Sequence, residues 1–304
     1  LDAYGIYYDL DLYSNFTYFL DHPVEGDQIN QVDQRGVLGL RFAHHMPVTG
    51  LGQRHELTAG LETRLDLVDV ALHDTRDRER VATVRSDEVT EWGSGAWLSL
   101  ESRWASRFRT LVGLRGDFYT FDVRSDDPRN SGERSAAIAS PKLSLMFGPW
   151  GSTELYGSAG LGFHSNDARG TTQSIDPQTG ERVEPVDPLV RSRGAEIGAR
   201  SSPLEGWRAS STCRRERTGC RARSKTSSLR ASPTTLSNLS LGWKFRNTGL
   251  RVVASVLNLF DAADSDIQYW YASRGQLEPE GGVEDLHFKP IEPRQVRVSV
   301  AWGL

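Results

Sequence analysis

Apolar and polar residues alternate along most of the chain, and this alternation is its most informative feature. Between Glu56 and Leu67 nearly every odd-numbered residue is apolar, while every even-numbered residue is polar, charged or glycine. A period of two indicates an extended strand with one apolar face. The same pattern ends the chain, where Val296, Val298 and Val300 alternate with polar or small residues. About twelve such segments can be counted, which predicts an all-β protein.

The connections between these strands alternate in length. Short turns are expected near residues 50, 105, 150, 205 and 248. The other connections are long and polar and are expected at residues 21–31, 68–88, 122–137, 165–189 and 261–291. Outer-membrane barrels have short periplasmic turns and long external loops. The pattern therefore predicts part of a transmembrane, antiparallel, up-and-down β-barrel, with the short turns in the periplasm.

Composition agrees with a barrel and excludes several other classes. Hydrophobic residues make up only 38% of the chain, and no apolar run approaches the roughly 18 residues of a membrane helix. Barrel strands need no such run, because only every second residue faces lipid. The formal net charge is −4, without the basic excess of nucleic-acid-binding proteins, so we expect no nucleic-acid partner.

Two features suggest that residues 1–304 are one barrel domain from a longer protein. The first residue, Leu1, already lies inside a strand pattern and follows neither Met nor a leader. A ninth strand begins at Trp207, but alternation is lost in residues 209–235, which are rich in Arg and Ser. We expect irregular coil there, either as an external loop or as the product of a frameshift or gene-model error. Both interpretations stay open.

Charged residues at inward positions are the main candidates for a functional surface. They would line the lumen of the barrel and are Glu62, Arg64, Asp66, Arg115, Asp117, Glu196 and Arg200. His164, Asn166 and Asp167 open a long loop and are candidate ligand contacts. The sequence has no nucleophile elbow, Walker loop or dinucleotide fingerprint, so we expect neither an enzyme nor a cofactor.

The sequence also predicts no metal site. Cys213 and Cys220 stand at a spacing that matches no standard zinc pattern, and no histidine lies nearby in the sequence. His44 and His45 are adjacent, so on a strand their side chains point to opposite faces. Surface positions are the simpler interpretation for these histidines and for His55.

Several short motifs together resemble one family. Val256 to Asp261 contains the run Asn-Leu-Phe-Asp, and Tyr269 to Arg274, Glu292 to Arg294 and the amphipathic last strand follow it. Upstream motifs of the same kind are Leu114 to Phe118, Ser140 to Leu143 and Gly160 to Asp167. In this order they resemble the barrel of TonB-dependent outer-membrane receptors, over about residues 1–208 and 236–304. The resemblance implies that a plug domain, a TonB box and further strands are missing, and that Trp302 and Leu304 help to close the barrel.

The resemblance also implies a function. Such a barrel lies in the lipid of the outer membrane of a Gram-negative bacterium and takes up a scarce small molecule, such as an iron–siderophore complex, another metal chelate or a vitamin. Its partner is the TonB complex, reached through the missing N-terminal part. Two alternatives stay open: a passive channel or autotransporter-type barrel, and a soluble all-β binding protein. We expect residues 1–304 alone to close incompletely, because missing strands would lie between Tyr4 and the last strand.

Overall fold

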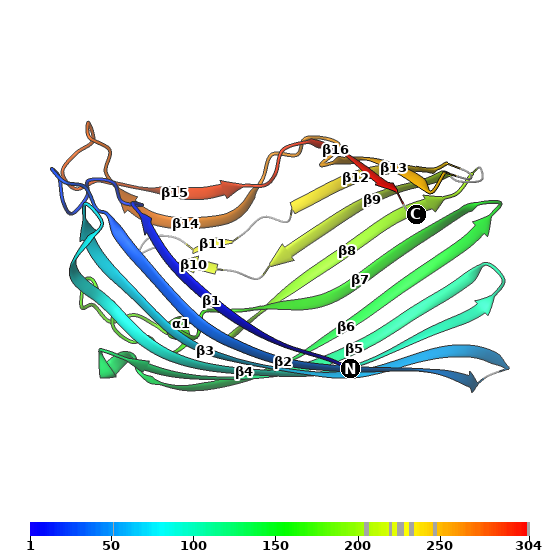
Figure 1. Ribbon diagram of the computed structural model, residues 1–304, viewed down its shortest axis with the longest axis horizontal. Coiled ribbons are helices and arrows are strands. Elements are labelled where there is room, and N and C mark those ends of the chain that lie inside the picture. The colour runs from blue at the N-terminus through cyan, green and yellow to red at the C-terminus, as the bar shows by residue number, and fades with distance from the viewer. Residues whose placement is uncertain are drawn as a thin grey trace.

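The chain forms one large antiparallel sheet of twelve strands, which confirms the predicted fold class (Figure 1). The structure is a computed structural model that describes residues 1–50, 52–203, 207–218, 221–223, 228–230, 234–245 and 248–302. The strands follow one another as sequence neighbours, as in an up-and-down meander. In order they are β1 (Asp2–Ser14), β2 (Ile29–Gly50), β3 (Gln53–Arg76), β4 (Glu79–Ala105), β5 (Phe108–Ser125), β6 (Gly132–Trp150), β7 (Thr153–Ser165), β8 (Leu189–Ser201), β9 (Trp207–Thr218), β12 (Thr234–Lys244), β13 (Leu250–Leu257) and β16 (Gln295–Trp302).

Smaller elements lie in the long connections. Two separate hairpins are formed by β10 (Arg221–Arg223) with β11 (Ser228–Arg230) and by β14 (Ser265–Ser273) with β15 (Val283–Pro290). The 3₁₀ turn η1 (Pro128–Asn130) joins β5 to β6, and the short helix α1 (Ala168–Thr172) lies between β7 and β8. No described helix has the length and apolar character needed to cross a membrane.

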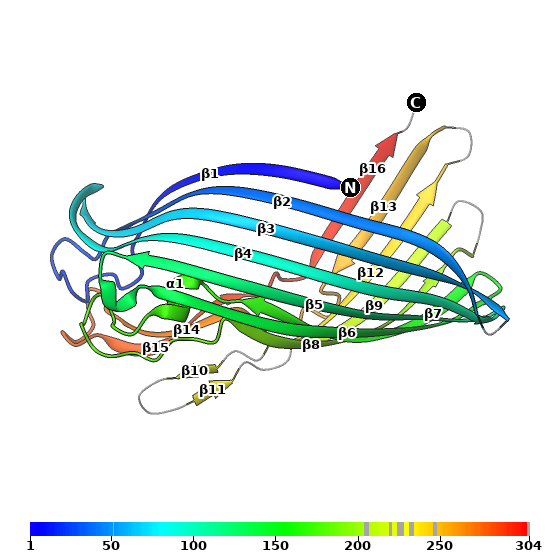
Figure 2. The same ribbon diagram turned by 90° about the horizontal axis from the view of Figure 1, so that it is seen from below.

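The sheet curves into an open trough (Figures 1 and 2). Among the described residues, β1 pairs only with β2 and β16 only with β13. No pair of described strands therefore closes the barrel, and the two edge strands run in different directions in Figure 2. Trp302 lies at the open edge with its side chain 74% exposed, and Leu304 lies outside the described residues. Their predicted closing role stays a prediction for a complete barrel.

Loops join the two sides of the trough where the strands do not. The backbone N–H of Phe19, in the β1–β2 connection, donates to the carbonyl of Arg274 at 3.1 Å, and the N–H of Arg274 donates to the carbonyl of Thr17 at 3.0 Å. Arg274 directly follows β14, so the hairpin β14–β15 reaches across to the first connection. We call this end of the sheet the loop end and the opposite one the turn end.

The outward face of the sheet is an exposed apolar surface. Leu61, Leu114 and Ile197 are each more than half exposed, because alternate residues of a strand point away from the inner face. Large aromatic side chains lie on this surface at two levels. Near the middle of β4 and β5 they include Trp92 and Phe118, and toward the turn end they include Trp104, Phe147, Trp150 and Phe245.

Two predicted loops are largely strand in the structure. In the loop expected at 122–137, residues 122–125 belong to β5 and residues 132–137 to β6. Residues 68–76 continue β3 and residues 79–88 begin β4, so the expected loop at 68–88 is wrong. The strands pair as far as Arg76 and Glu79 around a tight turn at Asp77 and Arg78, whose φ angles are 50° and 67°. The many charged residues in this segment indicated a loop. The backbone nevertheless pairs β3 with β4 there, because strand hydrogen bonds do not depend on the side chains.

The segment 209–235 is also more regular than expected. Residues 207–218 form β9, which pairs with β8 on one side and β12 on the other. The start at Trp207 is as predicted, but irregular coil is wrong for residues 209–218 and for Thr234 and Thr235, which belong to β12. Small polar side chains break the apolar pattern without preventing a strand, since both neighbours supply backbone hydrogen bonds.

Candidate functional site: a charged pocket on the inner face

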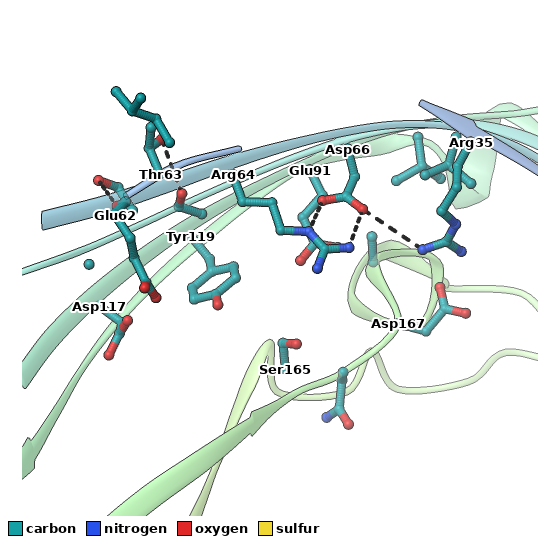
Figure 3. A pocket seen from close by; sticks show the side chains of 18 of the residues that line it. Arg35, Glu62, Thr63, Arg64, Asp66, Glu91, Asp117, Tyr119, Ser165 and Asp167 are labelled. Atoms are coloured by element: carbon teal, nitrogen blue, oxygen red, sulfur yellow. Dashed lines mark hydrogen bonds and ion pairs between the residues drawn. The ribbon is translucent and has the colours of Figure 1, made fainter. Parts of the chain in front are cut away.

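A pocket of about 620 Å³ lies on the inner face of β1 to β5, near the loop end. One wall is the sheet, and the other is the chain that leaves β7, from Ser165 to Arg169 (Figure 3). Its charged and polar lining comprises Asp33, Arg35, Arg41, Glu62, Thr63, Arg64, Asp66, Glu91, Ser94, Arg115, Asp117, Tyr119, Ser165, Asn166, Asp167 and Arg169. Strand alternation places the charged side chains of the sheet wall together, because inward positions recur at every second residue.

Arginines and carboxylates on the pocket wall form paired contacts along each strand. Arg64 donates to both carboxylate oxygens of Asp66, at 2.6 and 2.7 Å. Asp66 is also 3.9 Å from Arg35, which pairs with Asp33 on the neighbouring strand β2 (Figure 3). Each pair joins inward positions i and i+2 of one strand. Such partly exposed pairs contribute only about 0–1 kcal/mol of stability each, so their main effect is to hold the side chains in place.

A second network is centred on β5, two strands beyond β3. The Nε of Arg115 donates to Asp117 at 2.8 Å, and the same guanidinium also contacts Glu62 on β3. Among the described residues, Glu91 is the lining carboxylate that makes no hydrogen bond or ion pair. The wall therefore offers both hydrogen-bond donors and acceptors to a polar molecule, with one carboxylate free of direct partners.

Inward aromatic rings lie flat over glycines of the adjacent strand. A Cβ atom built on Gly60 would lie 2.1 Å from the ring of Trp97, and one on Gly93 would lie 2.7 Å from the ring of Tyr119. The guanidinium groups of Arg41 and Arg115 each lie 5.5 Å from the Trp97 ring centroid, within cation–π range. The glycines let these rings lie along the wall, which keeps space open beside the charged residues.

The loop wall of the pocket has its own internal bonds. The carboxylate of Asp167 accepts a hydrogen bond from the backbone N–H of Arg169 at 2.9 Å and pairs with its guanidinium at 2.6 Å. Burial alone would raise the pKa of Asp167, but the bonds from Arg169 outweigh it and leave the pKa below the usual Asp value. Asn166 donates to the carbonyl of Asp187 at 2.6 Å. Both residues therefore shape the loop as well as face the pocket.

The family follows from a comparison with known proteins. The model of the β-barrel of TonB-dependent receptor-like proteins matches residues 1–212, well over half of the chain. This chain belongs to the TonB-dependent receptor family. The match includes all the strands that form the sheet wall of the pocket. None of the curated protein sequences matches the chain.

Solved receptor structures share the barrel fold. The copper transporter OprC aligns with a TM-score of 0.57 and 13% identity, over 84% of this chain and 42% of OprC. The alcaligin outer-membrane receptor FauA from Bordetella pertussis gives 0.57 and 15%, over 84% and 46%. The ferric yersiniabactin uptake receptor FyuA from Yersinia pestis gives 0.52 and 10%, over 97% and 57%. The chain thus spans about half the length of these receptors.

Most of the candidate lumen and loop residues from the sequence analysis lie together in the structure. Five of the seven candidate lumen residues line the pocket, namely Glu62, Arg64, Asp66, Arg115 and Asp117, as do the loop candidates Asn166 and Asp167. The other residues lie elsewhere. His164 is exposed on β7, and Glu196 and Arg200 lie on β8, where the guanidinium of Arg200 is 4.6 Å from the ring centroid of Tyr156.

Sequence reasoning missed several lining residues of the receptor pocket. Asp33 and Arg35 occupy alternate positions of β2, and Glu91 precedes the outward Trp92 on β4. Each could have been found by extending the inward face of its strand. Arg169 could not have been found in this way, because it lies in α1, where strand alternation does not apply. Within the described part of the chain, no three His, Cys, Asp or Glu residues are grouped so that they could hold a metal ion.

Proposed function

We propose that residues 1–304 are part of the barrel of an outer-membrane receptor that takes up a scarce small molecule with energy delivered through TonB. The observation that carries this proposal is the difference between the two faces of the sheet. The outer face is apolar and exposed, the inner face carries paired charges, and the chain belongs to the TonB-dependent receptor family. An apolar outer band and a polar interior are what a bilayer demands of a barrel.

The spacing of outward aromatic residues supports insertion in a membrane. Trp92 and Trp104 both lie on the outward face of β4 and are 40% and 42% exposed. Twelve residues separate them along the strand, and at ~3.3 Å per residue with a tilt near 45° they span roughly 28 Å. That distance matches the hydrocarbon thickness of a bilayer, and Trp prefers both of its interfaces.

The long loops would then face the outside of the cell and the short turns the periplasm. A ligand would enter at the loop end, where the charged pocket lies. The pocket wall offers arginines, carboxylates and the ring of Tyr119, which suits a polar ligand with several hydrogen-bonding groups. The names of the similar receptors mention copper, alcaligin and ferric yersiniabactin, so we propose a metal chelate as the ligand class. A vitamin would use the same route.

Uptake by the intact receptor tests this function. Cells that carry the complete gene should accumulate a radiolabelled ferric siderophore in a saturable manner, and loss of TonB should abolish that uptake. Uptake that rises in proportion to concentration and ignores TonB would instead identify a passive channel. Binding of siderophore without any membrane association would favour a soluble binding protein.

Single cysteines test the orientation. We expect a membrane-impermeant maleimide to label Asp77→Cys, at the tip of the β3–β4 hairpin, on intact cells. The matched site, Thr248→Cys, lies in the turn that precedes β13 and should react only after the outer membrane is opened. Both positions are exposed, so accessibility within the protein does not separate them. Labelling of Thr248→Cys but not of Asp77→Cys on intact cells would reverse the orientation.

A further inference from the structure

The connection between β7 and β8 folds into the trough. We call residues 166–188 the inner strap. In Figure 2 its helix α1 lies between the first strands and the hairpin β14–β15, and Ala168 of α1 packs on inward residues of β4 and β5, so the strap occupies the inside of the trough near the loop end. This position raises the question of what holds a polar connection inside a charged lumen.

The inner face of the sheet changes character beneath the strap. Toward the middle of the sheet its inward residues are charged, but nearer the loop end they become apolar on three neighbouring strands. Phe121 and Val123 on β5 are 1% exposed, and with Val89 on β4 they form a cluster that Ala168 of α1 covers. An apolar patch on an inward face is stable only when something removes it from water. The strap does so.

Hydrogen bonds fasten the strap at a second place. Asn130 is fully buried, and its side-chain oxygen accepts the backbone N–H groups of Ser174 and Ile175, each at 3.0 Å. The hydroxyl of Thr172 donates to the carbonyl of Asn130 at 2.8 Å. Arg85 on β4 also donates to the side chain of Gln173 at 3.1 Å. The strap is thus bonded to the β5–β6 connection and to β4.

The strap is also a wall of the pocket. Asn166, Asp167 and Arg169 line the pocket opposite the sheet, and Figure 3 shows Asp167 on this wall. The guanidinium of Arg169 is held by Asp167 at 2.6 Å, so this wall presents a fixed ion pair. Without the strap, the charged pocket would open along its whole length toward the loop end.

We propose that the inner strap is a permanently folded wall that selects ligands by size, rather than a loop that opens to admit them. The strap forms one wall of the space in front of Glu91 and Arg64, opposite the sheet. This inference rests on the proposed function, since size selection matters only if a ligand enters here. Whether the strap stays folded can be tested in detergent without any transport.

The first test measures whether the strap stays folded. In the detergent-folded chain, Ala168→Cys should react with a small maleimide at least about tenfold more slowly than Thr179→Cys, because buried positions react only through local opening. Ala168 is 4% exposed, whereas Thr179 lies exposed in the same strap. Equal rates at the two positions would overturn the proposal.

A second substitution tests whether the hydrogen bonds of Asn130 hold the strap in place. Adding Asn130→Ala to the Ala168→Cys chain should speed its labelling about tenfold, since two buried N–H groups lose their acceptor. Arg129→Ala is the matched control, because that side chain contacts only Asp127 among the described residues and should leave the rate unchanged. The far-ultraviolet spectrum of each chain reports whether the sheet is intact. An intact sheet with unchanged labelling in the Asn130→Ala chain would overturn this fastening.

The second test measures size selection. Glu91→Cys places a thiol inside the pocket without removing a hydrogen bond. We expect a small maleimide to react with it readily and a polyethylene-glycol maleimide to react at least about tenfold more slowly. Adding Asn130→Ala should largely remove this difference, and adding Arg129→Ala should not. If the large reagent reacts equally fast with the strap fastened, the strap does not select by size. A failure of TonB-dependent uptake in cells would refute the proposed function but leave these results standing.

Discussion

Single residues decide how much space the inner face leaves free. Trp97 and Tyr119 are large inward side chains, yet the pocket on this face stays open, because the adjacent strand carries glycine beneath each ring. Glycine weakens a strand by itself, and the overlying ring restores part of that loss by packing. The sequence shows these glycines only as gaps in the polar face, whereas the structure shows what they accommodate.

Replacing Gly60 by alanine should therefore destabilise the sheet. The new Cβ would lie 2.1 Å from the Trp97 ring, so the ring must move off the wall or the strands must separate. Overpacking of this kind costs about 1–3 kcal/mol, measurable by denaturant unfolding in detergent together with Trp fluorescence. Gly36→Ala is the control, because a Cβ at Gly36 meets nothing within 4 Å. Equal losses for the two variants would show that the ring contact is unimportant.

The two faces of β3 should respond differently to charge. Leu61 is 59% exposed on the outward face, so Leu61→Arg should cost about 2–4 kcal/mol near the bilayer midplane. Glu62 points inward, where Glu62→Arg loses the contact with Arg115 and adds repulsion of about 1 kcal/mol. Yields of folded barrel in lipid, read from heat-modifiable gel migration, compare the variants. Similar yields would refute the assignment of the outward face to lipid.

At the scale of elements, the family motif has a structural explanation. Asn258 adopts a φ of 49°, and its side chain bonds the backbone of Ala262 in both directions and the carbonyl of Glu292. Asp261 accepts the N–H of Arg294 at 2.8 Å. These bonds fix a bend where the hairpin β13–β16 continues as β14–β15. The bend directs the outer hairpin toward the β1–β2 connection.

That connection depends on one buried carboxylate. Asp27 is 7% exposed, and its oxygens accept the N–H groups of Leu20 and His22 at 2.8 and 2.7 Å. Burial would raise the pKa of Asp27, but hydrogen bonds from Thr17 and from these backbone groups lower it overall. Because the folded pKa is depressed, this stabilisation is complete above the usual Asp pKa of about 3.9. It is lost as the pH falls through the lower folded value.

We expect Asp27→Asn to loosen residues 15–28 at neutral pH. Amide exchange at Leu20 and His22 should become about tenfold faster or more, because each hydrogen bond to a charged acceptor contributes roughly 1.5–3 kcal/mol. In the parent chain the same exchange should accelerate only below about pH 4. Asp126→Asn is a control in another connection. Protection that is unchanged in Asp27→Asn would show that the backbone alone holds this loop.

At the scale of the whole molecule, the open edges limit what residues 1–304 can do alone. The edge strands β1 and β16 leave backbone groups unpaired among the described residues. In hydrocarbon each unsatisfied N–H or C=O costs several kcal/mol. The bonds between Phe19, Thr17 and Arg274 close only the loop end. Stable insertion therefore requires further strands or another partner for these edges.

We predict that residues 1–304 reconstituted alone transport no ligand in a coupled manner. Vesicles should show either no insertion or an unselective leak, and the chain should need detergent to stay dispersed because of its exposed apolar face. Conductance and dye release measure the first outcome, and sedimentation without detergent measures the second. Saturable, energy-dependent uptake, or a stable monomer in plain buffer, would contradict this prediction.

The sequence by itself determined the all-β fold class, the alternating faces of most strands and the family, because side-chain alternation and short motifs are local properties. It therefore assigned Glu62, Arg64, Asp66, Arg115 and Asp117 to inward positions of their strands. Only the tertiary structure decided which of them share a pocket, because that depends on register and on the curvature of the sheet. It also decided that the inner strap lies over Phe121 and Val123, since the partner of an apolar patch is set by long-range packing that no local period records.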